Sequence, residues 1–333
     1  MIKIALDAMG SDNAPFSDVE GAVLAAREFS YEITLVGNQD LIKKELEKYK
    51  PIPSNISIHH ASEVIGMHEQ PVLSVRRKKD SSIVSLSNLA KEKKADAIVS
   101  AGNTGAMVCA ATLKCKLLSG IERAGIGIIM PTLKGPMVMI DGGANIDAKP
   151  SHLLQYGIMA SAYSEYIFNK KSPKVGLLNV GEEESKGTGF LKEAYSLLES
   201  SGLNFIGNVE GRDFFVGDCD VIVCDGLVGN VALKVTEAVV YAFEEMLKKE
   251  LKSRFLSLVG SMLAKNAFIS MKKKMDYAEY GGAPLLGVNG VCIIGHGSSN
   301  PKAIKNAIRV AGEEVVKNIN QHIIETIAIR RER

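Results

Sequence analysis

The 333-residue sequence has no tryptophan and only five cysteines. The cysteines form no CxxC pair and no cluster with histidine, which excludes the usual zinc-site and disulfide patterns. Cys219 and Cys224 lie on or beside an apolar stretch, so we expect buried, reduced thiols in an intracellular compartment. No run of about eighteen apolar residues occurs, and the N-terminus resembles a strand and not a signal peptide. The chain is therefore predicted to be cytoplasmic and to span no membrane.

Neither sign of charge is in excess, and several familiar cofactor and catalytic motifs are absent. Lys and Arg number 40 against 38 Asp and Glu, which argues against nucleic-acid binding as a main function. The sequence contains no GxxxxGK(S/T) phosphate loop and no GxGxxG after its first strand, so a nucleotide or nicotinamide cofactor is not indicated. GxSxG and HExxH are also missing, which leaves a serine hydrolase or zinc protease without support. We expect a reaction without cofactor, metal or enzyme-bound nucleophile.

What the sequence does contain is a repeated strand-to-helix turn rich in glycine. It occurs at 95–106, 138–147, 177–187 and 221–231, each time after a short apolar run. The first turn of a helix leaves backbone N–H groups unpaired, which makes it a natural anion site. In open α/β sheets, ligands bind at the carboxyl ends of the strands. Several such turns predict one composite pocket for a phosphate-bearing or otherwise anionic substrate.

The alternation of strand-like and helical stretches predicts an α/β fold of three layers, α/β/α, around a mostly parallel sheet. Two strand-like stretches are separated only by TLKG, which predicts an antiparallel hairpin within the parallel pattern. No repeat, low-complexity segment or linker is visible, so residues 1–333 are expected to form a single α/β domain. The strand-like stretches are 2–7, 33–37, 56–60, 97–101, 125–130, 136–141, 175–180, 221–225 and 291–295.

Residues 236–275 depart from this alternation because they are helical throughout and longer than a crossover requires. Their middle is rich in large apolar residues and is flanked by lysines, and Gly260 or Asn266 could bend them into a helical hairpin. We therefore expect a protruding helical arm over about 245–278. One interpretation is a structural role, as a dimerisation arm or as a helix packed on the core. The other is an amphipathic element that lies on anionic lipid. Both roles could combine in a dimer.

Two of the glycine-rich turns carry candidate ligand-binding residues. In SAGNTGA, Gly105 permits close approach to the backbone, and Asn103 and Thr104 add hydrogen-bond donors at the start of a helix. The alternative is a plain strand-to-helix turn capped by Asn or Thr. In DGLVGN, Asp225 ends an apolar strand and Asn230 follows in the next helix, where ligand contact and helix capping are equally good interpretations.

Three further loops carry candidate polar groups. Lys186 follows three glutamates in NVGEEESKG, and we favour it as a phosphate or oxyanion partner over a surface ion pair. Asp141 and Asn145 follow a buried strand, where hydrogen bonding within the loop is preferred to metal ligation. His296, with Ser298 two residues later, is either a proton donor or phosphate ligand, or a histidine bonded to the backbone.

Eight motifs follow one another in the order typical of the phosphate acyltransferases of the PlsX type. The resemblance extends from residue 2 to about 312, and the order makes it specific although each motif is weak alone. The chain departs from the family pattern at Ser11, Thr188 and Leu227, where Gly, Asn and Phe are usual. The motifs are LDAMGSDNAP, SAGNTGA, IDGGANID, NVGEEESKG, NVEGRD, VCDGLVGNVALK, YGGAPLLGV and GHGSSN.

The resemblance implies an enzyme that makes acyl phosphate from fatty acyl–acyl carrier protein and inorganic phosphate in bacterial phospholipid synthesis. It implies a fold similar to the isocitrate/isopropylmalate dehydrogenase group and the phosphotransacetylases. Members of the family are homodimers that work near the membrane, where a membrane glycerol-3-phosphate acyltransferase would take up the product. The implied location is therefore cytoplasmic with peripheral membrane association, and no cofactor is implied.

The candidate residues fit this chemistry, because phosphate is itself the nucleophile and a thiolate leaves readily. The protein then has only to hold phosphate against the thioester carbonyl and to stabilise the oxyanion. We expect catalytic roles for Lys186, His296 and Asp225. The expected substrate-binding residues are Asn103, Thr104, Gly105, Asp141, Asn145, Asn230 and Ser298.

Two other functions are considered. A dehydrogenase on the same fold would need a nicotinamide site and an acidic metal cluster, and the sequence shows neither. A membrane-surface adaptor would bind acyl carrier protein without releasing thiol. Because acyl carrier proteins are acidic, the basic stretches 76–79 and 272–274 are candidate docking patches in either a transferase or an adaptor.

Overall fold

The computed structural model describes residues 1–275 and 277–331, and its strands form two sheets. In the first sheet β1, β2, β3, β4 and β12 pair in parallel, and β11 and β5 are antiparallel additions at one edge. Its strands, in spatial order, are β3 (Ile56–His60), β2 (Tyr31–Gly37), β1 (Ile2–Asp7), β4 (Ala97–Ser100), β12 (Val291–Ile294), β11 (Ala283–Leu286) and β5 (Gly125–Ile126).

The second sheet is parallel apart from one hairpin. β6 pairs antiparallel with β7 through a tight turn, which confirms the hairpin expected from the short TLKG spacer. The remaining pairs, β7 with β10, β10 with β8 and β8 with β9, are parallel. In spatial order the strands are β6 (Ile128–Thr132), β7 (Gly135–Ile140), β10 (Val221–Val223), β8 (Lys174–Leu178) and β9 (Asn204–Val209).

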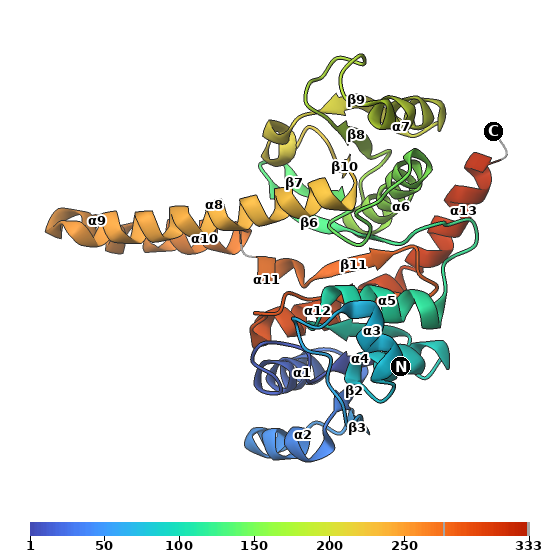
Figure 1. Cartoon of the computed structure of the whole chain (residues 1–333). Helices are drawn as coiled ribbons and strands as arrows, with labels where there is room; N and C mark the ends of the chain where they lie inside the picture. Colours follow the sequence, from blue (N-terminus) through green and yellow to red (C-terminus); the bar gives the residue numbers. More distant parts are fainter. Residues whose placement is uncertain (276, 332–333) are drawn as a thin grey trace.

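Helices cover both faces of each sheet, so the three-layer α/β/α fold is confirmed (Figure 1). Strands such as β4 are buried along their whole length, because apolar side chains on both faces meet helices. On the first sheet α1 (Phe16–Glu28) and α12 (Pro301–Val316) pack on one face. On its other face lie α4 (Ser82–Lys91) and α5 (Thr104–Cys115).

The second sheet is covered by α6, α7 and α13 on one face and by η2 and the start of α8 on the other. The prediction of a single domain stays a prediction. The bounds of these and the smaller helices are α2 (Gln39–Leu46), η1 (Glu47–Tyr49), α3 (Pro71–Arg77), α6 (Pro150–Phe168), α7 (Gly189–Ser200), η2 (Gly211–Phe215), α8 (Gly226–Ser253), α9 (Phe255–Leu263), α10 (Lys265–Met275), α11 (Tyr277–Tyr280) and α13 (Ile319–Arg331).

Figure 1 shows α8 leaving the body of the molecule with α9 at its far end, so the protruding helical arm is confirmed. The arm is interrupted at Arg254, whose backbone is extended, and at Ala264, where α9 ends. The two bend positions proposed from the sequence, Gly260 and Asn266, lie inside α9 and α10, so neither prediction was right. Among the described helices, α8 is the one that is long and apolar enough to cross a membrane by length and composition. The sequence showed no unbroken apolar run, because the apolar residues of α8 are interrupted by polar ones.

Candidate active site

The carboxyl ends of β1, β4 and β12 meet at one edge of the first sheet and bring distant motifs together. Asp7 is fully buried there, accepting hydrogen bonds from Met9 N at 3.1 Å and from Ser100 Oγ at 2.8 Å. A Cβ at Gly10 would lie 2.8 Å from the backbone nitrogen of Gly102, so glycine is needed for this close approach. The opening motif and the SAGNTGA turn are thus in direct contact.

The C-terminal GHGSSN loop joins the same edge. Its Gly297 accepts a 2.8 Å hydrogen bond from Asp12 N. His296 and Ser298 are exposed, and His296 Nδ1 lies 2.7 Å from Ser298 Oγ and 3.2 Å from Ser298 N. Since Nδ1 accepts from a backbone N–H, a neutral ring carries its proton on Nε2 and can act as a donor. The pair predicted from the sequence therefore lies together at the surface of this edge.

Asn103 is the N-cap of α5, and its side chain is fully engaged. Its Oδ1 accepts from Ala106 N at 3.0 Å. Its Nδ2 lies 3.1–3.2 Å from the carbonyl oxygens of residues 66, 67 and 69, so it ties a loop that precedes α3 to the start of α5. These contacts support the capping interpretation. Thr104 is exposed beside it, and Gly105 lies directly beneath the ring of Pro71.

A second cluster forms where β7 and β10 end. Asp141 is buried and accepts four backbone hydrogen bonds of 2.7–3.0 Å, from Ile126, Gly143, Ala144 and Asn145. Burial raises the pKa of this carboxyl, and the backbone donors oppose the shift. Hydrogen bonding within the loop, the interpretation preferred from the sequence, is what the structure contains.

The DGLVGN turn packs directly on this loop. Asp225 is the N-cap of α8, accepting from Leu227 N at 2.9 Å and Val228 N at 3.0 Å. Asn145 O accepts a hydrogen bond from Gly226 N at 3.1 Å. The side chain of Asn230 lies next to Gly143, since a Cβ added at Gly143 would be 3.4 Å from the Cβ of Asn230. The motifs at 138–147 and 221–231 therefore meet at the start of α8.

This second cluster also joins the two sheets. Ile126 belongs to β5 of the first sheet, and it both donates to the Asp141 carboxylate and accepts from Gly142 N at 2.8 Å. Ala144 packs against the core cluster that includes Ala106 of α5. The 141–145 loop thus lies at the junction of the two sheets, on the side of the first sheet that α5 covers.

Lys186 lies on a separate loop after β8. That loop is held by Asn179, whose Nδ2 donates to Asn208 Oδ1 at 3.1 Å and lies 3.3 Å from the carbonyl of Lys186. The Lys186 side chain is half-exposed over Gly181, with Nζ 3.9 Å from Glu183 Oε1. Within the described residues it contacts neither the Asn103 turn nor the Asn230 turn.

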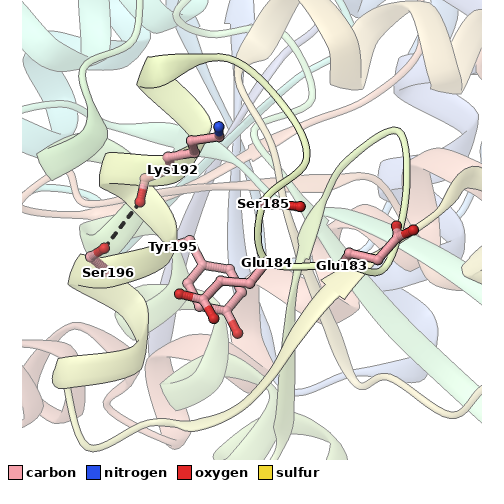
Figure 2. Close-up of a pocket in the computed structure, with 6 residues that line it drawn as sticks. All are labelled: Glu183, Glu184, Ser185, Lys192, Tyr195 and Ser196. Carbon is pink, nitrogen blue, oxygen red and sulfur yellow. Dashed lines mark hydrogen bonds between the residues drawn. The ribbon is translucent and has the colours of Figure 1, made fainter.

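A hollow lies beside this loop. It has a volume of about 490 Å³ and opens between the loop and α7 (Figure 2). Two glutamates and one lysine line it, so it is a poor site for an anion. Its lining residues are Glu183, Glu184, Ser185, Lys192, Tyr195 and Ser196.

Sequence reasoning missed two buried acids beneath the opening motif. Asp18 on α1 accepts a 2.7 Å hydrogen bond from Ser11 Oγ, and burial raises the pKa of its carboxyl to about 8. Burial likewise raises the pKa of the neighbouring Asp7. The LDAMGSD motif contains Asp7, but nothing in the sequence shows that α1 places a second carboxyl beside it. Among the described residues no group of His, Cys, Asp and Glu could hold a metal ion.

Comparison with known proteins identifies the relatives of this chain. Residues 2–322 match the family model described as fatty acid synthesis protein. A phosphate acyltransferase from Geotalea daltonii is 50% identical over 326 residues, covering 98% of this chain and 94% of the relative. A phosphotransacetylase from Streptococcus pyogenes superposes with a TM-score of 0.64 at 17% identity over 95% of this chain and 94% of that one.

A 4-hydroxythreonine-4-phosphate dehydrogenase from Salmonella typhimurium superposes with a TM-score of 0.50 at 11% identity, over 94% of this chain and 99% of that one. At such identities these two structures show the fold alone, and they confirm the expected likeness to phosphotransacetylases and to a dehydrogenase-like fold. The sequence matches go further and confirm the resemblance to the PlsX-type enzymes. The chain belongs to the family of fatty acid synthesis proteins and, like its curated relatives, is an acyltransferase.

Proposed function

We propose that the chain transfers a fatty acyl group from acyl carrier protein to inorganic phosphate. A phosphate oxygen attacks the thioester carbonyl, the new C–O bond forms, and the C–S bond breaks to release the carrier thiolate, which takes up a proton. The products are acyl phosphate and free carrier. In bacterial phospholipid synthesis this product would supply a membrane glycerol-3-phosphate acyltransferase.

The observation that carries this proposal is the meeting of two glycine-rich turns at the junction of the sheets. The 141–145 loop and the start of α8 place backbone N–H groups, the amide of Asn230 and the hydrogen-bonded carboxylates of Asp141 and Asp225 in one small region. The backbone N–H groups of these turns already donate to Asp141 and Asp225, so the exposed side-chain amide of Asn230 is the donor that we propose for the anion and the developing oxyanion. Asp141 and Asp225 act as orienting groups, because both accept from the backbone of these turns.

The state of the cysteines supports direct attack by phosphate. Cys219 and Cys224 are buried, as the sequence predicted, and burial raises the pKa of Cys219 to about 12 and that of Cys224 well above its usual range. Burial also raises the pKa of Cys109, Cys115 and Cys292. Because the thiolate is the nucleophilic form, these side chains are poorly suited to form an acyl-enzyme.

The experiment measures thiol release from palmitoyl-acyl carrier protein with and without phosphate, with hydroxylamine trapping of the acyl phosphate. We expect release that depends on phosphate and an equal yield of trapped acyl group. Release without phosphate, or an acylated side chain found by mass spectrometry during turnover, would contradict direct attack. Oxidation or reduction of NAD in the same mixture would favour a dehydrogenase, and binding of the carrier without thiol release would favour an adaptor.

Lys186 is proposed as the phosphate or oxyanion partner in this reaction. Its side chain is half-exposed and its closest carboxylate is 3.9 Å away, so it can leave Glu183 for a bound anion. Removing such a charged donor lowers turnover by about 10²-fold. Lys186→Ala should show this loss with normal stability, whereas Lys192→Ala on α7 serves as the control. Equal rates for the two variants would exclude Lys186 from the site.

We also propose that the protein is a homodimer that associates peripherally with the membrane. The arm supports both parts, because α8 and α9 expose large apolar side chains such as Met262 and Leu263, the latter 86% exposed. The side chains of 272–274, expected to flank the lipid-facing segment, lie outside the described residues. Met262→Glu combined with Leu263→Glu should reduce co-sedimentation with phosphatidylglycerol vesicles. Unchanged co-sedimentation would contradict the membrane role of the arm.

A further inference from the structure

The exposed face of α3 combines apolar and cationic side chains next to the candidate site. Val72 and Leu73 are 50% and 45% exposed, and Arg76 and Arg77, one helical turn later, are exposed as well. The face therefore has an apolar end and a basic end.

The position of α3 relative to the candidate site is fixed by two contacts. The Pro71 ring packs directly on Gly105, and the amide of Asn103 holds the loop that leads into α3. The pKa of the Cys109 thiol is raised by burial and lowered by the Arg76 charge, so α3 runs alongside the first turns of α5. The apolar end of α3 is thus the end next to the SAGNTGA turn.

The basic side chains of α3 have few acidic residues near them in the sequence. Neither 70–79 nor 97–121 contains an aspartate or glutamate. The two acids that flank 70–79 are engaged elsewhere. Glu69 is bonded to Lys78 Nζ at 2.6 Å and to Ser74 Oγ at 2.8 Å, and these bonds help hold the pKa of Glu69 at about 2. Asp80 accepts from Ser62 Oγ at 2.5 Å. Arg76, Arg77 and Lys79 have no ion-pair partner in the described part of the chain.

A shallow hollow lies on the same face. Its volume is about 360 Å³, and Leu73 and Arg77 form part of its wall together with Glu69, Gln70, Ser74 and Lys78. An apolar wall next to a free guanidinium suits an amphipathic helix that carries both apolar and carboxylate side chains.

We infer that α3 is the docking surface for the acyl carrier, an acidic helical protein whose carboxylates pair with Arg76 and Arg77 while an apolar side chain contacts Val72 and Leu73. This inference rests on the proposed function, because it names where the donor of that reaction binds. The carrier is favoured over a lipid surface because α3 shares a core cluster with the start of α5, and Ala144 of the proposed anion-binding loop packs against that same cluster. The surface of α3 therefore lies on the side of the molecule where the acyl group must be delivered. Figure 1 shows α3 on the body of the molecule, apart from the arm.

The test compares Arg76→Glu/Arg77→Glu with Lys43→Glu/Lys44→Glu, which makes the same change in net charge on exposed residues of α2. Phosphate-dependent turnover is measured with palmitoyl-acyl carrier protein and with palmitoyl-pantetheine, a neutral thioester without the carrier. The α3 variant should raise KM for the carrier substrate by about tenfold or more, with kcat and pantetheine turnover within about twofold. The α2 variant should match the wild type with both substrates.

Salt provides a second measurement. The wild-type KM for the carrier should rise between 50 and 300 mM NaCl, and that of the α3 variant should rise less, because screening acts on exposed charges. Leu73→Asn should raise KM with the wild-type salt dependence, since it removes only apolar contact.

Several outcomes would overturn the inference. Equal KM values for the α3 and α2 variants would do so. An equal loss of turnover with palmitoyl-acyl carrier protein and palmitoyl-pantetheine would also do so, because it would place the arginines in the reaction itself. Loss of vesicle binding or of self-association with an unchanged KM would assign α3 to lipid or to a second copy. If the wild type turns over neither thioester, the proposed function fails, and anisotropy of labelled carrier then decides the docking surface alone.

Discussion

At the scale of single residues, the edge of the first sheet depends on two acids that water does not reach. Asp7 and Asp18 are both fully buried, and the negative charge of Asp7 adds to the burial that raises the pKa of Asp18 to about 8. Near neutral pH Asp18 therefore keeps its proton in the folded protein. Its role is to accept from Ser11 Oγ and so to fix the start of the loop that contacts Gly102 and Gly297.

This buried acid makes stability depend on pH in a direction that can be predicted. An unfolded Asp ionises near pH 3.9, at about the value of a model peptide, whereas folded Asp18 ionises only at about pH 8. Between these values the unfolded chain binds fewer protons, so the free energy of unfolding falls as pH rises, by up to about 1.4 kcal/mol per pH unit. Asp18→Asn, which cannot ionise, should lack this contribution.

The measurement is urea unfolding of wild type and Asp18→Asn at pH 5, 6, 7 and 8. The variant should gain stability relative to the wild type at each step, although its absolute stability at pH 5 depends on how well the amide fits. Two curves that stay parallel across this range would show that Asp18 ionises normally in the folded protein.

Residue by residue, sequence reasoning identified which side chains lie in the glycine turns but not what engages them. Asp141 was correctly expected to bond within its own loop, because three of its four backbone donors are neighbours in sequence. The fourth, Ile126, lies fifteen residues earlier and was not foreseen. The partners of Asn103 lie more than thirty residues earlier, and their carbonyl groups carry no side-chain signal. Lys186 illustrates the same limit, since the sequence cannot show that its loop stands apart from the other two clusters.

At the scale of elements, α5 and α3 form one unit through Asn103. Most N-cap residues satisfy only the N–H groups of their own helix, as Asn38 does for α2 through Asp40 N at 3.0 Å and Leu41 N at 3.2 Å. Asn103 does this for α5 and also holds the loop before α3. The proposed docking helix and the candidate site thus share one buried amide.

Asn103→Ala should therefore lower stability more than a simple cap substitution does. Loss of a cap lowers the free energy of unfolding by about 1 kcal/mol, and loss of the buried amide donors adds about 1–3 kcal/mol. Asn38→Ala should lower it only by the first amount, which makes it a matched control. Hydrogen exchange of residues 66–70 should accelerate in the Asn103 variant alone. Equal destabilisation of the two variants, or unchanged exchange of this loop, would contradict the linkage.

Element prediction succeeded where apolar runs were strong and failed where they were weak. The strands that build the centre of both sheets were found, with ends that agree to within two residues. The predicted strand 125–130 was wrong, because it divides into β5 of the first sheet and β6 of the second. β9 was missed because its sequence, NFIGNV, contains two asparagines and a glycine. β11 was missed because APLL is short and contains a proline that fits only a position without a backbone donor. The division of the strands between two sheets was not expected, since βα alternation does not state which strands pair.

At the scale of the whole molecule, α8 has one face on the second sheet and another with no covering. Ala232 and Leu233 pack against the core cluster of that sheet. Facing away lies a stripe of exposed side chains four residues apart, which includes Val231, Val235 and Val239 at 55%, 57% and 62% exposure. A contiguous apolar stripe of this kind is typical of a self-associating helix.

A second copy of the chain is the partner that we expect on this stripe. In a two-fold dimer the same α8 face meets itself, so one substitution changes the interface twice. Val235→Lys would place two like charges against each other in a region from which water is excluded, and should raise the dimer dissociation constant by at least about tenfold. Val316→Lys, at the exposed end of α12, is the matched control because it makes the same side-chain change outside the stripe.

Light scattering after size exclusion, over a range of concentrations, checks this prediction. The wild type and Val316→Lys should have twice the 35.8 kDa mass of the chain, and Val235→Lys should approach a single mass on dilution. A monomeric wild type at all concentrations, or an undisturbed Val235→Lys dimer, would show that the stripe serves another surface. Because α8 begins at Asp225 and Asn230, a dimer through this helix would also hold the second cluster in place. Val235→Lys should therefore lower turnover in parallel with its loss of dimer.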